Sequence, residues 1–229
     1  MRIAATGAGA AGVAWALPAL APIVPPLAGP LGIDLTVDAP GAVALTFDDG
    51  PHPEGTPAVL EALAARGAVA TFFLVGEQVA RRPALAAEIA AAGHAVELHG
   101  HRHRNLLRLP PRALATDLDR GAALVGEAAG QPPRLHRAPL GIYSPAALAA
   151  VRARGWRPTL WSRWGRDWRR SATPEGIAAT AATGLTAGDV VLLHDADYYS
   201  AAGSWRRTVA ALPRILDAVE TRGLRTVIL

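Results

Sequence analysis

The sequence predicts an α/β fold in which parallel strands close into a small barrel. Short apolar runs alternate with stretches of helical spacing from Ala42 to the end of the chain. The apolar runs are continuous, as expected of strands that are buried on both faces. The chain has 229 residues, of which 51% are hydrophobic, so it can bury one large core. Seven strand–helix repeats over this length are typical of a small α/β barrel.

Strands and helices are expected to alternate along the chain. Apolar or β-rich runs predict strands over 42–47, 68–75, 95–98, 134–136, 157–161, 189–193 and 224–228. Helical spacing predicts helices over 57–66, 77–92, 112–129, 145–154 and 206–221, and one that opens at 173–175. Ser144 is a predicted N-cap, since its hydroxyl can accept a free N–H, and Pro145 suits the first helical position. Gly93, Gly130 and Gly223 follow three of the helices and are expected to end them.

The first segment differs in composition from the rest of the chain. No ionisable side chain occurs from Ile3 to Ile33, and Arg2 precedes this run. This layout is typical of a secretory signal or a membrane anchor, so we expect a secreted or membrane-anchored protein outside the cytoplasm. Pro18 should end or kink a helix, and the stretch before it is shorter than the ~20 residues of a membrane span. We therefore expect a leader over 1–33, a proline-containing linker over 34–41 and the folded domain over 42–229.

Composition excludes several kinds of chemistry. The chain has no cysteine, which rules out a disulfide scaffold, a thiolate metal site and a cysteine nucleophile. It has no lysine either, which rules out a Schiff base and a P-loop lysine. The arginines give a net charge of +4 but form no basic stripe, so no nucleic-acid partner is predicted. Any metal must be bound by histidine and carboxylate side chains.

Polar side chains follow the predicted strands at the points where the strands end. In an α/β barrel these ends meet on one face, and that face carries the active site. The residues in question are Asp48, Asp49, His99, His103, Arg137, Asp167 and His194.

Two imidazoles and one carboxylate from this set predict a metal site. His99 and His103 are four residues apart and would share one face of a helix, so both could reach one ion. Asp48 and Asp49 end the first strand, where one can bind a metal while the other faces a substrate. Two His and one Asp leave coordination positions open, as in a catalytic zinc-type site.

Five segments in this order resemble the NodB-type polysaccharide deacetylases, carbohydrate esterase family 4. The segments are Thr46–Pro51 (TFDDGP), His99–His103, Arg137–Gly141, Trp161–Trp168 and Leu192–His194. The resemblance covers 42–229, which would be the catalytic domain, and implies a distorted (β/α)7 barrel. It also implies that Asp49, His99 and His103 bind a divalent metal, zinc in the first place, with Co²⁺, Mn²⁺ and Ni²⁺ as alternatives.

The same resemblance assigns the acid and base of a hydrolysis. Asp48 would be the general base for the attacking water, and Arg137 beside it would keep it ionised. His194 would protonate the departing amine, and Asp167 would favour its imidazolium form. The backbone N–H of Leu140 would stabilise the oxyanion.

Trp168 and Tyr143 are expected on the substrate side of the site. Gly100 replaces the Ser or Thr that usually follows the first metal-binding histidine, and Leu140 replaces a common tyrosine. Trp164 stands where the fourth segment often has an aspartate. These departures leave the metal and acid–base residues intact and affect the identity of the substrate. The loop over 197–205 either lines a substrate groove or packs as a surface loop, and both alternatives stay open.

The implied function is metal-dependent N-deacetylation of a chitin-like, peptidoglycan or lipid-linked amino sugar. The alternatives are an O-acetyl esterase or a non-sugar amidase on the same fold, and a non-catalytic glycan-binding wall protein. The expected partners are a carbohydrate and, through the leader, a membrane. No particular oligomeric state is predicted.

Overall fold

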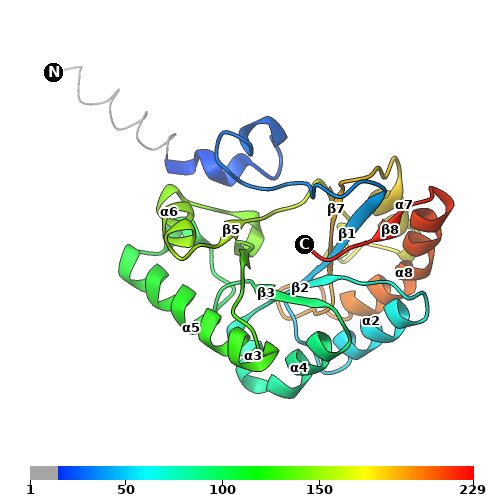
Figure 1. The fold of residues 1–229 in the computed structure, drawn as a ribbon, viewed down its shortest axis with the longest axis horizontal. Coiled ribbons are helices and arrows are strands. Elements are labelled where there is room, and N and C mark those ends of the chain that lie inside the picture. Colours follow the sequence, from blue (N-terminus) through cyan, green and yellow to red (C-terminus); the bar gives the residue numbers. More distant parts are fainter. Residues whose placement is uncertain (1–14) are drawn as a thin grey trace.

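The computed structural model of the protein describes residues 15–229. A curled sheet of parallel strands lies at the centre, and helices cover its outer side (Figure 1). The part of the predicted leader over residues 1–14 lies outside the described residues. Within the described part of the chain, we find no helix with the length and apolar character needed to cross a membrane.

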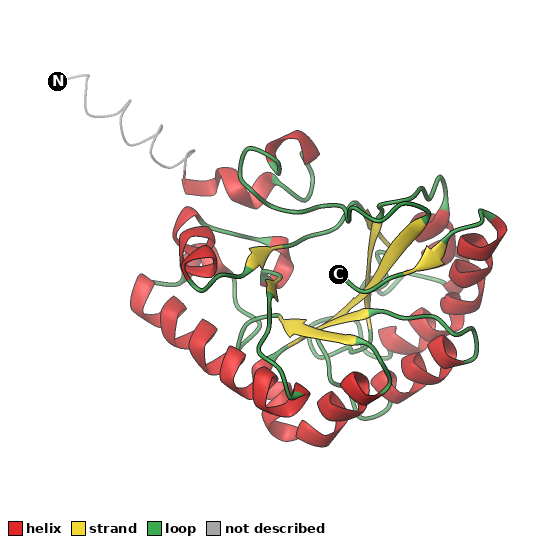
Figure 2. Cartoon of the chain, in the orientation of Figure 1, coloured by secondary structure: helices red, strands yellow, loops and turns green. Residues whose placement is uncertain are grey.

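The strands pair in parallel and form a half-barrel, which confirms the predicted fold class (Figure 2). Their order across the sheet is β5-β4-β3-β2-β1-β7-β6, and β8 pairs with the first residues of β1. The strands are β1 (Ala42–Asp48), β2 (Thr71–Leu74), β3 (Ala95–Leu98), β4 (Leu135–His136), β5 (Arg157–Pro158), β6 (Arg163–Trp164), β7 (Val190–His194) and β8 (Arg225–Thr226).

The helices return the chain from one strand to the next along the outer surface of the sheet (Figures 1 and 2). They are α2 (Gly55–Ala64), α3 (Gly76–Arg81), α4 (Pro83–Ala91), α5 (Pro111–Ala129), α6 (Pro145–Ala153), α7 (Pro174–Ala182) and α8 (Ser204–Thr221). The predicted N-cap is confirmed, because the Ser144 side chain accepts a hydrogen bond from the N–H of Ala147. Thr173 caps α7 in the same way through the N–H of Gly176.

Two element predictions were wrong. The single helix expected over 77–92 is two helices, because Pro83 lacks the N–H that a continuous helix needs and Arg82 takes an extended φ of −146°. The strand expected over 157–161 pairs regularly only over β5. After it the chain crosses to β7, where the short strand β6, which was not predicted, joins the sheet.

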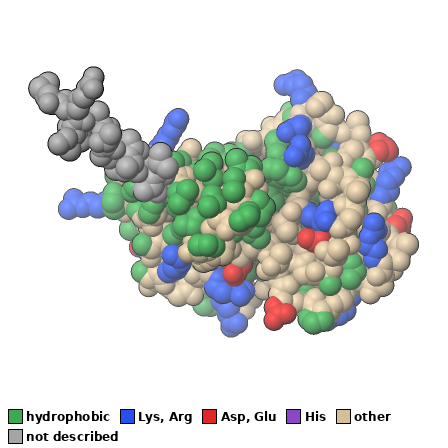
Figure 3. Space-filling view, turned by 90° about the horizontal axis from the view of Figure 1, so that it is seen from above, with side chains coloured by type: hydrophobic (Ala, Val, Ile, Leu, Met, Phe, Trp, Pro, Cys, Tyr) green, Lys and Arg blue, Asp and Glu red, His purple; other side chains and the backbone are tan. Residues whose placement is uncertain are grey.

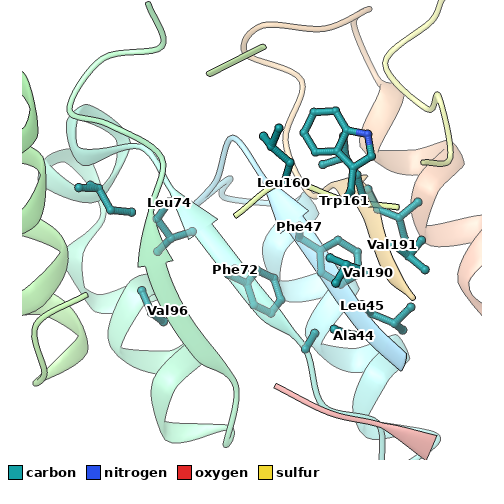
Figure 4. Close-up of a cluster of buried hydrophobic side chains, with 14 of the residues drawn as sticks. Ala44, Leu45, Phe47, Phe72, Leu74, Val96, Leu160, Trp161, Val190 and Val191 are labelled. Carbon is teal, nitrogen blue, oxygen red and sulfur yellow. The ribbon is translucent and has the colours of Figure 1, made fainter. Parts of the chain in front are cut away.

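Apolar side chains of the central strands fill the interior, and every residue of β1 is buried. Phe47 of β1 and Phe72 of β2 stack with their ring centroids 5.1 Å apart. Leu45, Val190 and Val191 lie close to this pair (Figure 4). Each such side chain contributes about 1.5–3 kcal/mol by leaving water. This rigid centre fixes where the strands end, and so fixes the polar groups that follow them.

The N-terminal segment pairs with the chain beyond β5, at one edge of the sheet, and with the chain before β7, next to the other edge strand β6. Asp34 forms a β-bridge with Thr159 beyond β5, and Thr36 forms another with Asp189 before β7. The N–H of Asp34 donates to the carbonyl of Pro158 at 2.9 Å. Residues 34–37 thus close the gap between the two ends of the half-barrel (Figure 1).

Candidate active site and metal centre

The carboxyl ends of β1, β3, β4 and β7 bring most of the predicted site residues around one cavity of about 230 Å³. Asp48 lies directly opposite His194 in the β1–β7 pair, and Leu98 lies opposite His136 in the β3–β4 pair. These two registers place His99 beside Arg137. The cavity is lined by Asp48, Asp49, His99, His103, Leu140, Gly141, Trp161, Trp164, Trp168, Leu192, His194, Tyr199 and Ser200.

Asp49, His99 and His103 converge on one point of this cavity. Asp49 Oδ1 lies 3.5 Å from His99 Nε2 and 3.4 Å from His103 Nε2. One ligand atom from each of the three residues lies within 4.8 Å of the others. Asp49 takes a positive φ of 80°, a conformation that non-glycine residues rarely adopt, directly after β1. This turn directs the carboxylate towards the two imidazoles.

The chemistry of these three groups fits a divalent cation. Asp49 Oδ1 is buried and has no hydrogen-bond partner among the described residues, which is costly unless a cation binds it. His99 Nδ1 lies 2.9 Å from the carbonyl of Arg137, which can only accept, so Nδ1 donates to it and Nε2 is the ring nitrogen that faces Asp49. Burial lowers the pKa of His103 to about 4, which keeps this imidazole neutral. One carboxylate and two imidazoles match the ligands that zinc and similar ions prefer.

The histidines meet for a different reason from the one predicted. Residues 99–103 form a loop and not a helix, and Gly100 has a φ of 78°. The first residues of α3 hold this loop, since the N–H groups of Gly76 and Glu77 donate to the carbonyls of Gly100 and His101. Asp117 of α5 accepts the N–H of His101 at 2.8 Å. A Cβ at position 100 would lie 3.2 Å from Asp117 Oδ2 of α5. This close approach and the positive φ both favour glycine there, where the resembling family has Ser or Thr.

Asp48 is paired with a fully buried arginine. Arg137 Nη1 donates to Asp48 Oδ1 at 2.7 Å and to Thr46 Oγ1 at 2.7 Å. Its Nη2 donates to the carbonyl of Leu160 at 2.8 Å, and its guanidinium carbon lies 3.9 Å from the centre of the Phe73 ring. Burial lowers the pKa of Arg137, and the charge of Asp48 opposes that effect. The geometry fixes Asp48 while its other oxygen, Oδ2, lies 3.8 Å from His99 Nε2.

His194 forms the opposite side of the site and is paired with Asp167. Asp167 Oδ1 lies 2.9 Å from His194 Nδ1, and Asp167 Oδ2 accepts the backbone N–H of His194 at 2.7 Å. Thr208 of α8 donates to the same Oδ2 at 2.8 Å. Burial acts to lower the pKa of His194, but the Asp167 charge and hydrogen bond outweigh it and raise this pKa to about 10. The group is therefore a proton donor at Nε2, which lies 4.0 Å from Asp49 Oδ2.

Aromatic side chains form the walls of the cavity. Trp164 lies between Trp161 and Trp168, with ring centroids 6.0 and 5.8 Å away. Trp168 then meets His194 edge-on at 5.6 Å. On the other wall Tyr199 stacks on His103, with ring centroids 4.2 Å apart and planes 9° apart.

The loop over 197–205 combines both of the alternatives left open by the sequence. Tyr199 and Ser200 line the cavity, whereas Trp205 is buried against the protein. The Tyr199 hydroxyl donates to Glu77 Oε1 at 2.8 Å and accepts from Gln78 Nε2 at 3.1 Å. Helix α3 therefore holds both the loop that carries His99 and His103 and the tyrosine that stacks on His103.

Three predicted substrate-side residues lie in different places. Trp168 lines the cavity, and Leu140 lies at its mouth with 58% of its surface exposed. Tyr143 does not reach the cavity, because its ring is fully buried and its hydroxyl bonds to His136. A substrate contact by Tyr143 is therefore contradicted by its burial. Sequence reasoning missed Thr46 and Thr208, whose hydroxyls complete the hydrogen bonds of Arg137 and Asp167.

Comparison with known proteins shows what the chain is similar to. A family model described as polysaccharide deacetylase matches residues 37–159. A chitooligosaccharide deacetylase of Bradyrhizobium sp. is 35% identical over 189 residues, which are 80% of this chain and 86% of that protein. A peptidoglycan-N-acetylglucosamine deacetylase of Bacillus cereus is 36% identical over 188 residues, covering 81% of this chain and 84% of that protein.

Solved structures with a similar fold include other hydrolases. The Bc1960 peptidoglycan N-acetylglucosamine deacetylase superposes with a TM-score of 0.80 at 28% identity, covering 86% of this chain and 91% of that one. A family 4 acetyl xylan esterase from Clostridium thermocellum, solved with a cobalt ion, superposes with a TM-score of 0.74 at 28% identity. That match covers 82% of this chain and 87% of the esterase.

Proposed function

The chain belongs to the polysaccharide deacetylase family of hydrolases, and on this premise we propose that it removes N-acetyl groups from an amino-sugar polymer or oligosaccharide with one divalent metal ion. The resemblance to NodB-type deacetylases drawn from the five motifs is thereby confirmed. The substrate class, the metal dependence and the roles of the individual residues are our proposal.

The arrangement of side chains around Asp49 is the main support for this proposal. A buried carboxylate with an unpaired oxygen lies between two imidazoles, and a paired base and a paired acid flank it. The base candidate Asp48 is tied to Arg137, and the acid candidate His194 is tied to Asp167. All the groups that a hydrolysis needs thus face one cavity.

Asp49, His99 and His103 would bind the ion, which supplies Lewis acidity that activates a water and polarises the acyl oxygen. Asp48 accepts the proton of the attacking water, because the hydrogen bond from Arg137 holds its carboxylate in place. The carbonyl carbon of the acetamide becomes tetrahedral as the water oxygen adds to it. The backbone N–H of Leu140 donates to the oxygen that becomes anionic.

His194 completes the reaction by donating a proton from Nε2 to the departing amine nitrogen. The C–N bond then breaks, and the products are acetate and the free amino sugar. Asp167 orients the ring through Nδ1 and stabilises the positive charge before the transfer. The proton that Asp48 took from the water then passes through solvent to His194, which restores both groups for the next cycle.

Ester hydrolysis is a second candidate for the same site. The similarity to the acetyl xylan esterase supports it, and Leu140 leaves the cavity mouth without the aromatic group common at this position. An O-acetyl group needs the same base and oxyanion donors but a weaker acid, since an alkoxide leaves more easily than an amide anion.

Metal analysis together with acetate release separates these candidates. We expect the purified protein to contain about one divalent ion, and to release acetate from chitooligosaccharides or peptidoglycan fragments faster than from acetylated xylan. A chelator should abolish the reaction, and added zinc should restore it. Undiminished acetate release by the metal-free protein would contradict the proposed mechanism. Glycan binding without acetate release would instead favour a non-catalytic protein.

A further inference from the structure

Exposed large hydrophobic side chains are concentrated on the N-terminal segment. Over residues 15–229, seven such side chains are exposed, and five of them lie between residues 15 and 24. Figure 3, which views the molecule from above relative to Figure 1, shows hydrophobic side chains gathered over one broad area. Exposed patches of this kind mark interaction surfaces. We name the five the N-terminal apolar patch: Trp15, Leu17, Leu20, Ile23 and Val24.

The segment that carries this patch is attached to the folded domain. Pro18 and Ala21 face inward and are buried, whereas Ile23 is 64% exposed. Farther along, Ala28 is buried, and the guanidinium of Arg152 on α6 donates to the backbone carbonyl of Leu31. The apolar side chains of the patch are therefore held outward by a segment whose other side is packed.

The patch lies next to the mouth of the cavity. Pro22 Cγ lies 3.0 Å from the point where a Cβ on Gly141 would be, so the segment touches the turn over Pro139–Gly141. This turn lines the cavity, and Leu140 is itself a sixth exposed hydrophobic residue. A surface that covers the patch would therefore also lie beside the entrance to the active site.

The chemistry of the N-terminal segment favours a lipid surface as the partner that covers the N-terminal apolar patch. No ionisable side chain occurs from Ile3 to Ile33, so the patch and the chain leading to it bring no carboxylate to an anionic membrane. Arg2 precedes this run, and Arg152 lies against its far end. Apolar side chains with a tryptophan insert at the boundary of headgroups and acyl chains, and arginines bind the phosphates there.

We propose that the N-terminal apolar patch docks on an anionic lipid bilayer and places the cavity mouth at the membrane surface. The favoured substrate is then an N-acetylated glycan that is carried on a lipid or lies against the membrane. This statement about the substrate rests on the proposed deacetylase function, whereas the docking itself does not.

Vesicle flotation with the full chain tests the docking. The probe is vesicles of phosphatidylethanolamine and phosphatidylglycerol, compared with vesicles of phosphatidylcholine alone. We expect the wild type to float with the anionic vesicles and the double variant Leu20→Asp/Ile23→Asp to lose about tenfold or more in partitioning. The matched control is Ile228→Asp, which adds a charge at a hydrophobic residue that is 47% exposed outside the patch and should bind like the wild type.

The same variants test the consequence for the substrate. Acetate release from a soluble chitooligosaccharide should be equal in all three proteins, which also shows that they are folded. Release from an N-acetylglucosaminyl lipid in the vesicles should fall only in the double variant. If no protein acts on the soluble glycan, the deacetylase function fails while the flotation result still stands.

Three results would overturn the docking proposal. The first is wild-type protein that does not float, and the second is a double variant that floats as well as the wild type. The third is a concentration-dependent dimer, seen by analytical ultracentrifugation without lipid, that the double variant abolishes. That result would make the patch a contact between two copies of the chain.

Discussion

Replacement of Asp167 by Asn tests how the site keeps His194 protonated. The variant keeps the shape of the side chain, and its carbonyl oxygen can still accept from Thr208 and from the His194 backbone. It removes the negative charge 2.9 Å from His194 Nδ1. Burial lowers the pKa of His194, and the pair with Asp167 is the main effect that raises it to about 10. Without the pair, we expect a pKa at or below the ordinary ~6.5, a change of at least about 3 units.

The lower pKa expected for His194 in the variant can be followed by the pH dependence of stability and by NMR. A raised pKa stabilises the folded state fully below pH ~6.5, and the stabilisation is lost as the pH rises towards 10. The wild type should therefore lose stability between these values more steeply than the variant. In histidine NMR of the metal-free proteins, the His194 ring should titrate near 10 in the wild type and below ~6.5 in the variant.

The rate of acetate release at pH 8 should fall by about 30-fold or more in the variant. With a pKa at or below ~6.5, only about one in thirty of its His194 side chains is still protonated at that pH. A divalent ion on Asp49 repels the imidazolium, so the alkaline limb of the loaded wild type should lie below pH 10. Equal titration of His194 in the two metal-free proteins would refute the role given to Asp167.

Three further substitutions have definite expected outcomes. Burial raises the pKa of Glu97 to about 7, although Glu97 accepts the N–H groups of Arg134 and Leu135. Because this pKa is raised, the contribution of Glu97 to folding stability is fully present below pH ~4.3 and is lost as the pH rises through 7. In urea melts, the wild type should therefore lose about 3 kcal/mol of unfolding free energy relative to Glu97→Gln between pH ~4.3 and 7. Tyr199→Ala should weaken metal binding by up to about tenfold in calorimetric titration, because it removes the stack on His103, whereas Tyr199→Phe should not; equal affinities would remove any role for the ring. Arg137→Met should destabilise the protein by about 3–5 kcal/mol in chemical denaturation, since Asp48 stays buried and unpaired; a loss under 1 kcal/mol would contradict this.

The sequence predicts those parts of the site that lie at the ends of buried strands. Asp48 and His194 follow apolar runs, and parallel pairing brings such ends together whatever their distance along the chain. The convergence of His99 and His103 was predicted for the wrong reason, because their spacing of four residues suggested a helix. Gly100, with its positive φ, instead allows a loop that α3 holds by backbone hydrogen bonds and α5 holds through the carboxylate of Asp117.

Other features depend on packing that a sequence pattern does not contain. Tyr143 lies two residues after the predicted site segment Arg137–Gly141, but its ring is buried in the core. The stack of Tyr199 on His103 joins residues nearly a hundred positions apart through a loop without regular structure. The break before Pro83 did have a local signal, since proline in a helix interior removes a hydrogen bond. The helical spacing on both sides of it masked that signal.

The metal content and turnover of two neighbouring variants test the central claim most directly. Asp49→Ala removes a proposed ligand, and Asp48→Asn removes the proposed base without touching the ligands. By elemental analysis and acetate release, we predict that Asp49→Ala loses both the ion and activity, while Asp48→Asn keeps about one ion and loses activity. If Asp48→Asn loses the ion and Asp49→Ala keeps it, or if either variant turns over like the wild type, the proposed division of roles between these carboxylates is wrong.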